Sequence, residues 1–396
     1  MTAHLVGIGQ AAEFHALGPA SVRLPLPPRF SFGTFPADIA AHYYDALHLP
    51  ADGIYSGAGF VVSDFFVMDR EARLLYGGEI NLHPFRFNDM NAARQAAIAA
   101  APRRRVPGAA ALLFPPGDGR LMYGHWMVDA LPRLALLEQA GHNLSNLWYP
   151  VPNDIPRFVF ALLKLFGVPE NRLVGCAPGD VLEPDAVLIP TAMHNGVRFS
   201  TMLTESLALF RRAMTRAGAM LVAQNAPARI YLARTGTNRQ LLNRDSIEAM
   251  ALAAGFVIVH AEQMPLPQQF ALFAAAREIT GEYGAAFHNA IFSPPGTVVC
   301  ALRGSETHPA FIQSGIGEVM AQPTGYVFGK SVSVPAPHDY TVREQDFADC
   351  LRCVFGSKAD ISLTRPAPPQ SKVISELPSE RPARRGSLLG DLLGRR

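Results

Sequence analysis

The chain has 396 residues, of which 49% are hydrophobic and 17% are charged. This length allows two domains of ~150–200 residues, and the apolar share excludes wholesale disorder. The formal net charge is +2, and seven of the 35 basic but only three of the 33 acidic residues lie in 365–396. The rest of the chain is close to neutral. This excludes the basic stripe on a folded surface that is typical of nucleic-acid-binding proteins.

Four cysteines are too few for a disulfide scaffold in a chain of this length. Cys350 and Cys353 form a C-x-x-C pattern without a second pair, so we interpret them as structural rather than redox-active or zinc-binding. The N-terminus lacks the pattern of a secretory signal. The longest clean apolar stretch, 249–259, is far shorter than the ~20 residues that span a bilayer. We therefore expect a cytoplasmic protein.

The first half of the chain gives a mixed pattern of strands and helices. Residues 1–35 are rich in proline and resist assignment, and 102–107 and 115–119 are predicted as a loop and a turn. The remaining apolar segments predict strands over 54–66, 74–80, 109–114 and 187–189, and helices over 123–140 (with Pro132 inside), 153–166 and 204–219.

From residue 229 onward strands and helices alternate. Strands are predicted over 229–233, 256–260, 278–281 and 297–302, with helices over 246–254, 267–277 and 285–292 between and after them. This alternation predicts a doubly wound, largely parallel sheet. A final helix is expected over 342–354. After Lys358 the composition of proline, serine, arginine and glycine predicts a disordered tail.

The first candidate site is the segment Gly124-His125-Trp126-Met127-Val128-Asp129. On a helix, His125, Asp129 and Arg133 lie on one face. A carboxylate one turn from a histidine can fix its tautomer and raise its basicity, which would make a general base. Arg133 would add a positive charge for a phosphate or carboxylate. The alternative is a helix start with a polar face and a local ion pair. A metal site would need further ligands.

The second candidate site, 234–245, follows a strand and precedes a helix, and ligands of doubly wound sheets bind at the carboxyl ends of strands. Arg234, Arg239, Arg244 and Asn243 could grip a diphosphate there, although a solvated turn is the alternative. A third segment, 281–289, also follows a strand. Its small residues would let the backbone approach an anion, or would simply allow tight packing.

Four segments together resemble glycosyltransferase family 61: YGHWMVDALPRL, IYLARTGTNRQLLN, AGFVIVHAEQMPLPQQFALFAAAREITG and GAAFHNAIFSPPGTVV. They begin at residues 123, 230, 254 and 284, and the resemblance covers roughly 123–302. It implies a GT-B arrangement of two Rossmann-like domains that face a cleft. It also implies an inverting transferase that uses a nucleotide-sugar without an obligatory metal or other cofactor. Similar bacterial members act in capsule and other surface polysaccharide assembly.

The resemblance also implies roles for individual residues. His125 and Asp129 would face the cleft as catalytic groups, and Arg234 and Arg239 would neutralise the leaving diphosphate. The remaining donor-cleft residues would be Glu262, Gln269, Gly284, Ala285 and Asn289. The sequence departs from the family pattern where Tyr283, Ala286 and His288 stand in place of a usual histidine, glycine and small residue or threonine. Tyr283 can still donate a hydrogen bond.

The expected organisation has four parts: an irregular, β-rich region (1–100), an acceptor-side α/β domain (101–222), a donor-side Rossmann-like domain (223–358) and the disordered tail (359–396). The expected partners are a nucleotide-sugar and a glycan acceptor. Leucines in the tail leave open a peripheral association with the inner face of a membrane. The alternative function is a non-catalytic relative that binds a glycan or nucleotide-sugar within an assembly complex. Tyr283 supports this alternative, whereas His125 and Arg234 favour an enzyme.

Overall fold

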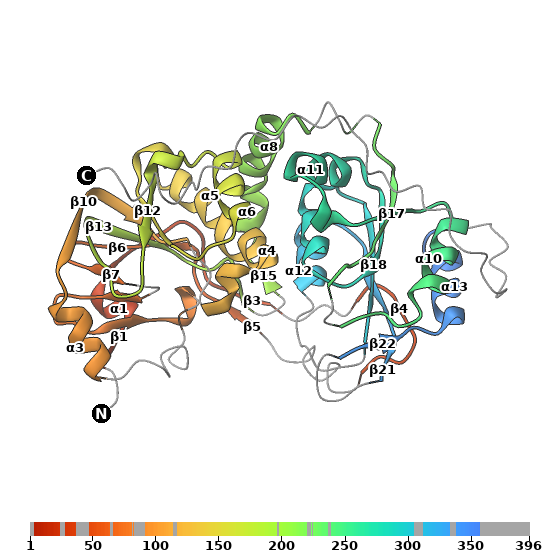
Figure 1. Cartoon of the computed structure of the whole chain (residues 1–396), viewed down its shortest axis with the longest axis horizontal. Helices are drawn as coiled ribbons and strands as arrows, with labels where there is room; N and C mark the ends of the chain where they lie inside the picture. Colours follow the sequence, from red (N-terminus) through yellow and green to blue (C-terminus); the bar gives the residue numbers. More distant parts are fainter. Residues whose placement is uncertain are drawn as a thin grey trace.

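The computed structural model describes residues 4–23, 28–36, 47–63, 66–80, 82, 92–113, 117–195, 198–219, 223, 225–236, 239–304, 312–332 and 338–356. The tail expected over 359–396 lies outside these residues. The described chain is a mixed α/β protein built on two sheets, and Figure 1 shows a lobe around each sheet. We call these the first lobe and the second lobe.

The first lobe contains an eight-stranded mixed sheet with the order β1-β9-β8-β7-β13-β6-β2, and β10 pairs with β13. Its strands are β1 (Leu5–Gly7), β2 (Glu13–Ala16), β6 (Gly53–Gly57), β7 (Val61–Ser63), β8 (Phe66–Met68), β9 (Leu74–Tyr76), β10 (Arg103–Ala111) and β13 (Val181–Pro190). The β1–β9 and β10–β13 pairs are parallel and the other pairs are antiparallel. The long strand β13 pairs with β7 near its start and with β6 near its end, so the sheet curls.

The second lobe contains a six-stranded sheet with the order β17-β16-β18-β19-β20-β4, and all its pairs are parallel. Its strands are β4 (Ser31–Phe32), β16 (Arg229–Leu232), β17 (Val257–Val259), β18 (Glu278–Glu282), β19 (Val298–Arg303) and β20 (Thr324–Phe328). Because β17 lies on one side of β16 and β18 on the other, the direction of winding switches between β16 and β18. The predicted doubly wound parallel sheet is confirmed.

Helices cover both sheets (Figure 1). In the first lobe they are α1 (Ile8–Ala11), α3 (Ala92–Ala100), α4 (Tyr123–His125), α5 (Leu131–Gln139), α6 (Arg157–Leu165), α7 (Met202–Glu205) and α8 (Leu207–Arg216), with a π-helical turn, η4 (Trp126–Ala130). In the second lobe they are α10 (Arg244–Ala253), α11 (Leu266–Ala275), α12 (Ile312–Val319) and α13 (Glu344–Cys353), with the 3-10 helix η8 (Ala285–Phe292). Short two-stranded pairs complete the fold: β3 (Ser21–Arg23) with β5 (Leu47–Leu49), β11 (Tyr149–Pro152) with β12 (Leu173–Cys176), β14 (His194–Asn195) with β15 (Arg198–Phe199), and β21 (Lys330–Ser331) with β22 (Tyr340–Thr341).

The loop predicted over 102–107 is wrong, because this segment begins strand β10. Its three arginines are exposed and pair in parallel with the start of β13. The register shifts between Val106 and Ala109, which accommodates Pro107 in the strand. Charged side chains and a proline suggested a loop, but an edge strand tolerates both.

The helix predicted over 123–140 forms with a π-helical turn in its middle. Pro132 has no N–H to donate to the carbonyl four residues before it. The hydrogen-bond pattern widens one residue before Pro132, where the N–H of Leu131 donates to the carbonyl of Trp126, five residues back. This wider turn carries Asp129 and buries it completely. Such turns often occur at functional sites.

The two lobes share one continuous hydrophobic core. Phe292 from η8 packs against Phe210 from α8, with ring centroids 5.5 Å apart, and against Phe270 from α11 at 4.1 Å. The same cluster of buried side chains continues into α5 and α6 of the first lobe. The lobes are therefore packed together by apolar contacts and not only tethered by the chain.

Strand pairing crosses the boundary expected near residue 100. Strands from residues 5–76 and strands β10 and β13 belong to the same sheet. In addition, β4 lies in the second lobe although its residues come from the first 35 of the chain. The division into segments at 100 and 222 stays a prediction. The sheets themselves combine residues from both sides of residue 100.

Candidate active site

The first group of functional side chains lies at the start of the α4–η4–α5 helix. Nδ1 of His125 lies 2.5 Å from Oδ2 of Asp129, one turn further along. The other carboxylate oxygen of Asp129 bonds to Nε2 of His194 in β14. The Asp129 side chain is 1% exposed, whereas the His125 side chain is 44% exposed. A buried carboxylate thus bridges two imidazoles, and His125 is the member of this group most open to solvent.

The surroundings of Asp129 keep it ionised. Burial alone would raise its pKa, but the attraction of His194 and the hydrogen bonds from both imidazoles outweigh burial and lower the pKa below its ordinary value. A carboxylate in this position accepts the N–H at Nδ1 of His125. The opposite ring nitrogen, Nε2, is then the one available to accept a proton.

His288, from η8 of the second lobe, lies against this group. A Cβ placed on Gly124 would come 2.8 Å from the His288 ring and 3.1 Å from the side chain of Ala285. The absence of a side chain at Gly124 therefore lets the two lobes meet closely here. Burial lowers the pKa of His288 to about 4, so this imidazole is neutral at pH 7.

Arg133 lies behind the histidine–aspartate group. Its side chain is buried, and Nη2 is 3.5 Å from the carbonyl of Ile80. Burial lowers its pKa to about 10, partly opposed by Asp129, so the guanidinium still carries its charge at neutral pH. The structure places Arg133 inside the first lobe rather than in the pocket described next. Its role in substrate binding stays a prediction.

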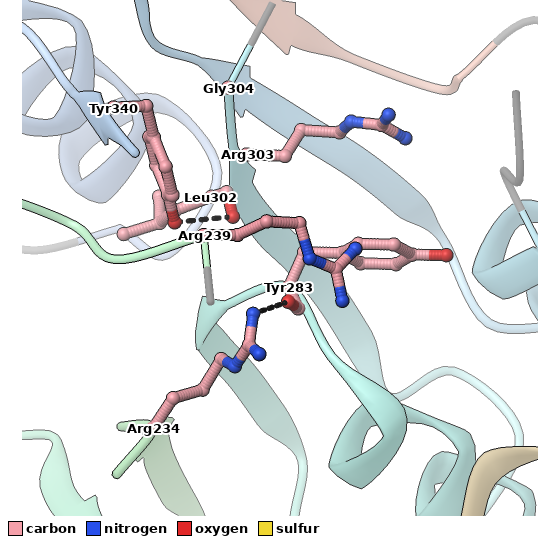
Figure 2. A pocket seen from close by; sticks show the side chains of 7 residues that line it. All are labelled: Arg234, Arg239, Tyr283, Leu302, Arg303, Gly304 and Tyr340. Carbon is pink, nitrogen blue, oxygen red and sulfur yellow. Dashed lines mark hydrogen bonds between the residues drawn. The ribbon is translucent and has the colours of Figure 1, made fainter. Parts of the chain in front are cut away.

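The second group lies at the carboxyl edge of the parallel sheet. A pocket opens there, lined by Arg234, Arg239, Tyr283, Leu302, Arg303, Gly304 and Tyr340 (Figure 2). These residues follow or end strands β16, β18 and β19, except Tyr340, which bonds to the carbonyl of Leu302. Arg234 and Tyr283 come just after the two strands between which the winding switches, which is where such folds bind ligands.

The charge of this pocket suits an anionic ligand. Three arginines, Arg234, Arg239 and Arg303, line one small pocket. Arginine guanidinium groups bind phosphate oxygens through paired hydrogen bonds.

Partly buried hydrogen bonds hold Arg234 in place. Its Nη1 donates to the carbonyl of Tyr283 at 3.1 Å, and its backbone N–H donates to Oε1 of Glu282 at 3.3 Å. Glu282 also receives two hydrogen bonds from Arg244, at 2.8 and 3.0 Å, and its side chain is fully buried. Arg244 therefore holds the Glu282 carboxylate, which in turn anchors the loop of Arg234. Arg244 itself does not line the pocket.

Tyr283 is covered by one of the pocket arginines. The guanidinium of Arg303 lies 5.3 Å from the centre of the Tyr283 ring. Only 8% of Tyr283 is exposed, and burial raises the pKa of its hydroxyl against the opposing effect of Arg303 and Arg239. The ring thus forms one wall of the pocket, and its hydroxyl stays protonated at neutral pH.

Two other predicted residues brace the loop of Arg234. Glu262 accepts hydrogen bonds from the backbone N–H and the hydroxyl of Thr235, both at 2.7 Å. Asn243 donates to the carbonyl of Val342 at 2.8 Å and accepts from its N–H at 3.1 Å. Neither residue lines the pocket, so their direct contact with a donor stays a prediction.

Gln269 and Asn289 belong to a buried chain of hydrogen bonds between the lobes. The hydroxyl of Tyr123 donates to Oδ1 of Asn289 at 2.5 Å, and Nδ2 of Asn289 donates to Oε1 of Gln269 at 3.1 Å. Gln269 in turn donates to the carbonyl of Met264. These predicted donor-site residues thus join α4 to η8 and α11.

Two adjacent residues connect the histidine group and the arginine pocket. A Cβ on Gly284 would lie 3.4 Å from the Arg234 side chain, and the Ala285 side chain lies against Gly124. Neighbouring Cα atoms are 3.8 Å apart. The start of the α4 helix and the pocket arginine therefore lie on either side of one dipeptide, and the role of Gly284 and Ala285 in lining a donor cleft stays a prediction.

The sequence did not reveal two members of these groups. His194 lies 65 residues from Asp129 in a short strand pair, and Arg303 ends a strand that had no visible motif. The position of Arg303 at the end of a predicted strand was the available signal, because carboxyl ends of parallel strands share one edge. Across the part of the chain that the structure describes, no three acidic, histidine or cysteine side chains meet in a way that would hold a metal ion.

A family comparison agrees with this arrangement. The sequence model of the family described as Glycosyltransferase 61 matches residues 123–300. This span begins at Tyr123 of α4 and ends within β19, so it contains His125, Asp129, Arg234 and Arg239. Residues 123–300 belong to glycosyltransferase family 61.

The chain is therefore a glycosyltransferase, and its substrates are a sugar donor and an acceptor. A comparison with curated proteins gave no match. None of the helices in the described segments combines the length and the apolar character needed to cross a membrane.

Proposed function

We propose that this family 61 enzyme transfers a sugar from a nucleotide-sugar to a glycan acceptor with inversion at the anomeric carbon. In this proposal the lobes form a GT-B-like pair. The second lobe binds the donor at its arginine pocket, and the first lobe presents His125 to the acceptor. The supporting observation is the three-arginine pocket at the switch point of the parallel sheet, one dipeptide away from the helix of His125.

His125 is the proposed general base. Both oxygens of Asp129 are occupied by imidazoles and its side chain is buried, so this carboxylate has no access to an acceptor hydroxyl. His125 is exposed and carries its N–H toward Asp129. Its Nε2 would take the proton from the hydroxyl as the oxygen attacks the anomeric carbon. Asp129 and His194 would orient the base and stabilise the imidazolium that forms.

The arginines would stabilise the leaving group. As the bond from the anomeric carbon to the diphosphate breaks, negative charge grows on the phosphate oxygens. Arg234, Arg239 and Arg303 would neutralise this charge, so we propose that transfer needs no obligatory metal. Arg234→Ala should weaken nucleoside diphosphate binding by about 1.5–3 kcal/mol. An unchanged dissociation constant in calorimetry would remove Arg234 from the site.

The proposed cellular role is the assembly of a bacterial surface polysaccharide, carried out in the cytoplasm or at the inner face of the membrane. The resemblance to the family supports this role. The first experiment is a thermal-shift and calorimetric screen of the whole chain against UDP, GDP, CMP and dTDP, with and without Mg²⁺. A ligand that binds the folded state raises its melting temperature.

The screen and the product together test the proposal. A nucleotide that binds equally well without Mg²⁺, followed by NMR of a product with the inverted anomer, is the expected result. Failure of every nucleotide to bind a well-folded sample would overturn the proposed donor site. Donor binding without turnover in the parent would instead favour the non-catalytic alternative, with Tyr283 as the residue to exchange for histidine.

A further inference from the structure

Two buried polar side chains of the second lobe have atoms without a hydrogen bond of good geometry, and we call these atoms unpaired. Gln313 in the first turn of α12 is fully buried, and within the described residues both its Oε1 and its Nε2 are unpaired in this sense. Nδ1 of His288 in η8 is also buried and unpaired there. A buried amide with both ends unpaired is costly to stability, and native proteins rarely retain one without a reason.

These two side chains are neighbours and lie beside the proposed base. Helix α12 packs against η8, and a hydrogen-bonding contact of the Gln313 side chain raises the pKa of His288, against the larger effect of burial. The geometry of this contact is too poor to satisfy either side chain. His125, Asp129 and His194 also act on the pKa of His288. The His288 ring lies where a Cβ on Gly124, next to His125, would meet it. The unpaired atoms thus lie where the two lobes meet.

The chemistry of the pair suits neutral hydroxyl groups. At pH 7 the His288 imidazole is neutral, because burial lowers its pKa to about 4, and the Gln313 amide carries no charge at any pH. An amide offers both a donor and an acceptor, and a neutral imidazole offers one of each. A sugar hydroxyl also donates and accepts. A carboxylate would find no positive charge in this pair to balance its own.

The pair also lies where the sugar of a bound donor would extend. Side chains three residues apart in a 3-10 helix share a face, so Ala285 and His288 both point toward Gly124, as the contacts confirm. Gly284 precedes Ala285 and lies beside the side chain of Arg234 in the pocket. A sugar attached to a diphosphate at the arginines would thus run along this dipeptide toward His288.

We infer that His288 and Gln313 form a subsite for hydroxyl groups of a neutral donor sugar, which deepens the proposed function and rests on it. Both side chains are buried, and the His288 ring lies beside Gly124 of the other lobe. A hydroxyl therefore reaches the pair when this contact opens, and it then fills the unpaired positions next to His125. The subsite orients the sugar and sets which sugar is accepted.

Calorimetry on Gln313→Met separates recognition of the sugar from recognition of the diphosphate. The probes are UDP, GDP and dTDP, each paired with its neutral hexose conjugate (UDP-glucose, GDP-mannose and dTDP-glucose), and UDP-glucuronate as the charged sugar. We expect the parent to bind the matching hexose conjugate more tightly than the bare diphosphate. Gln313→Met should reduce that preference about 10-fold and leave the Kd for the bare diphosphate unchanged.

Thermal stability provides the matched control. Gln95 is also buried, but its amide donates to the carbonyls of Ala72 and His4 and accepts from the N–H of His4. Gln95→Met should lower the melting temperature without affecting the preference for the sugar. Gln313→Met should hold or raise the melting temperature, because it removes an unpaired amide.

Each result has one meaning. Loss of the hexose preference in Gln313→Met with intact diphosphate binding supports the subsite. An unchanged preference, or a parent that favours UDP-glucuronate over UDP-glucose, overturns the subsite alone. If the parent binds none of the three diphosphates and no CMP, the proposed donor site fails and the subsite fails with it. Binding of CMP alone overturns the subsite, which is placed along a sugar on a diphosphate.

Discussion

Asp129 is the residue on which the proposed chemistry depends. The sequence predicted its pairing with His125 but left open which of the two acts as the base. It also gave no sign of the contact between Asp129 and His194, because the spacing of residues within a segment does not predict contacts between distant segments. Burial of the carboxylate and its use of both oxygens support His125 as the base.

Replacing the carboxylate tests this assignment. An asparagine at position 129 cannot accept hydrogen bonds from both imidazoles, so one of them must change its tautomer or rotate. We expect Asp129→Asn and His125→Ala each to lower kcat by about 10²–10⁴-fold, with less than additive loss in the double variant. Steady-state transfer rates measure this, with the exposed Asp185→Asn as control. Rates within a few-fold of the parent would contradict the assignment.

His288 gives a prediction for stability. In the unfolded chain a histidine titrates near pH 6.5, whereas burial lowers the pKa of His288 to about 4 in the folded protein. Between these values the unfolded state binds the extra proton, so the free energy of unfolding falls as the pH falls from 6.5 toward 4. His288→Gln should lack this contribution of about 2–3 kcal/mol. Urea unfolding between pH 7 and pH 4.5 measures the difference, and parallel curves for parent and variant would refute it.

At the scale of elements, the doubly wound sheet was predictable because each buried parallel strand is a short apolar run followed by a helix. The pocket at its carboxyl edge followed from the same rule, and Arg234 and Arg239 were found in this way. Other features depend on pairing between distant segments. The first half of strand β10, over 103–107, looked like a loop by composition alone, and its pairing with β13 overrides that composition.

Gly281 is required by the approach of two strands at the switch point. Its φ is +130°, and a Cβ there would meet the backbone of Leu232. Gly281→Ala should lower the free energy of unfolding by about 1–3 kcal/mol and weaken diphosphate binding, because Leu232 leads into the loop of Arg234. Gly296, with φ +81° and nothing within 4 Å, is the control for backbone strain alone. Equal losses in Gly281→Ala and Gly296→Ala would show that the contact with Leu232 is unimportant.

At the scale of the whole molecule, the lobes are joined by apolar packing and by buried polar links. The Tyr123–Asn289–Gln269 chain is one link, and the ion pair between Arg198 of β15 and Glu318 of α12 is another. The sequence predicted two α/β units that face each other. It could not show how firmly they are attached, because this depends on residues that meet only after folding.

Removing one hydroxyl tests the attachment. Tyr123→Phe leaves Oδ1 of Asn289 buried without its donor, so the free energy of unfolding should fall by about 1–3 kcal/mol. Because the core is continuous, calorimetry should still show a single transition. Tyr149→Phe, which loses a bond within the first lobe, is the control and should leave diphosphate binding unchanged. Two separate transitions in the parent would contradict the shared core.

The position of β4 matters for how the protein is made and divided. The ribosome synthesises residues 31–32 long before β20. The edge strand β4 therefore has no partner to pair with until nearly 300 further residues have been made. Expressing 223–358 alone would leave the edge of β20 uncovered, and uncovered edges promote aggregation. A soluble fragment of the second lobe would therefore need the 28–36 segment supplied as a fused or separate peptide.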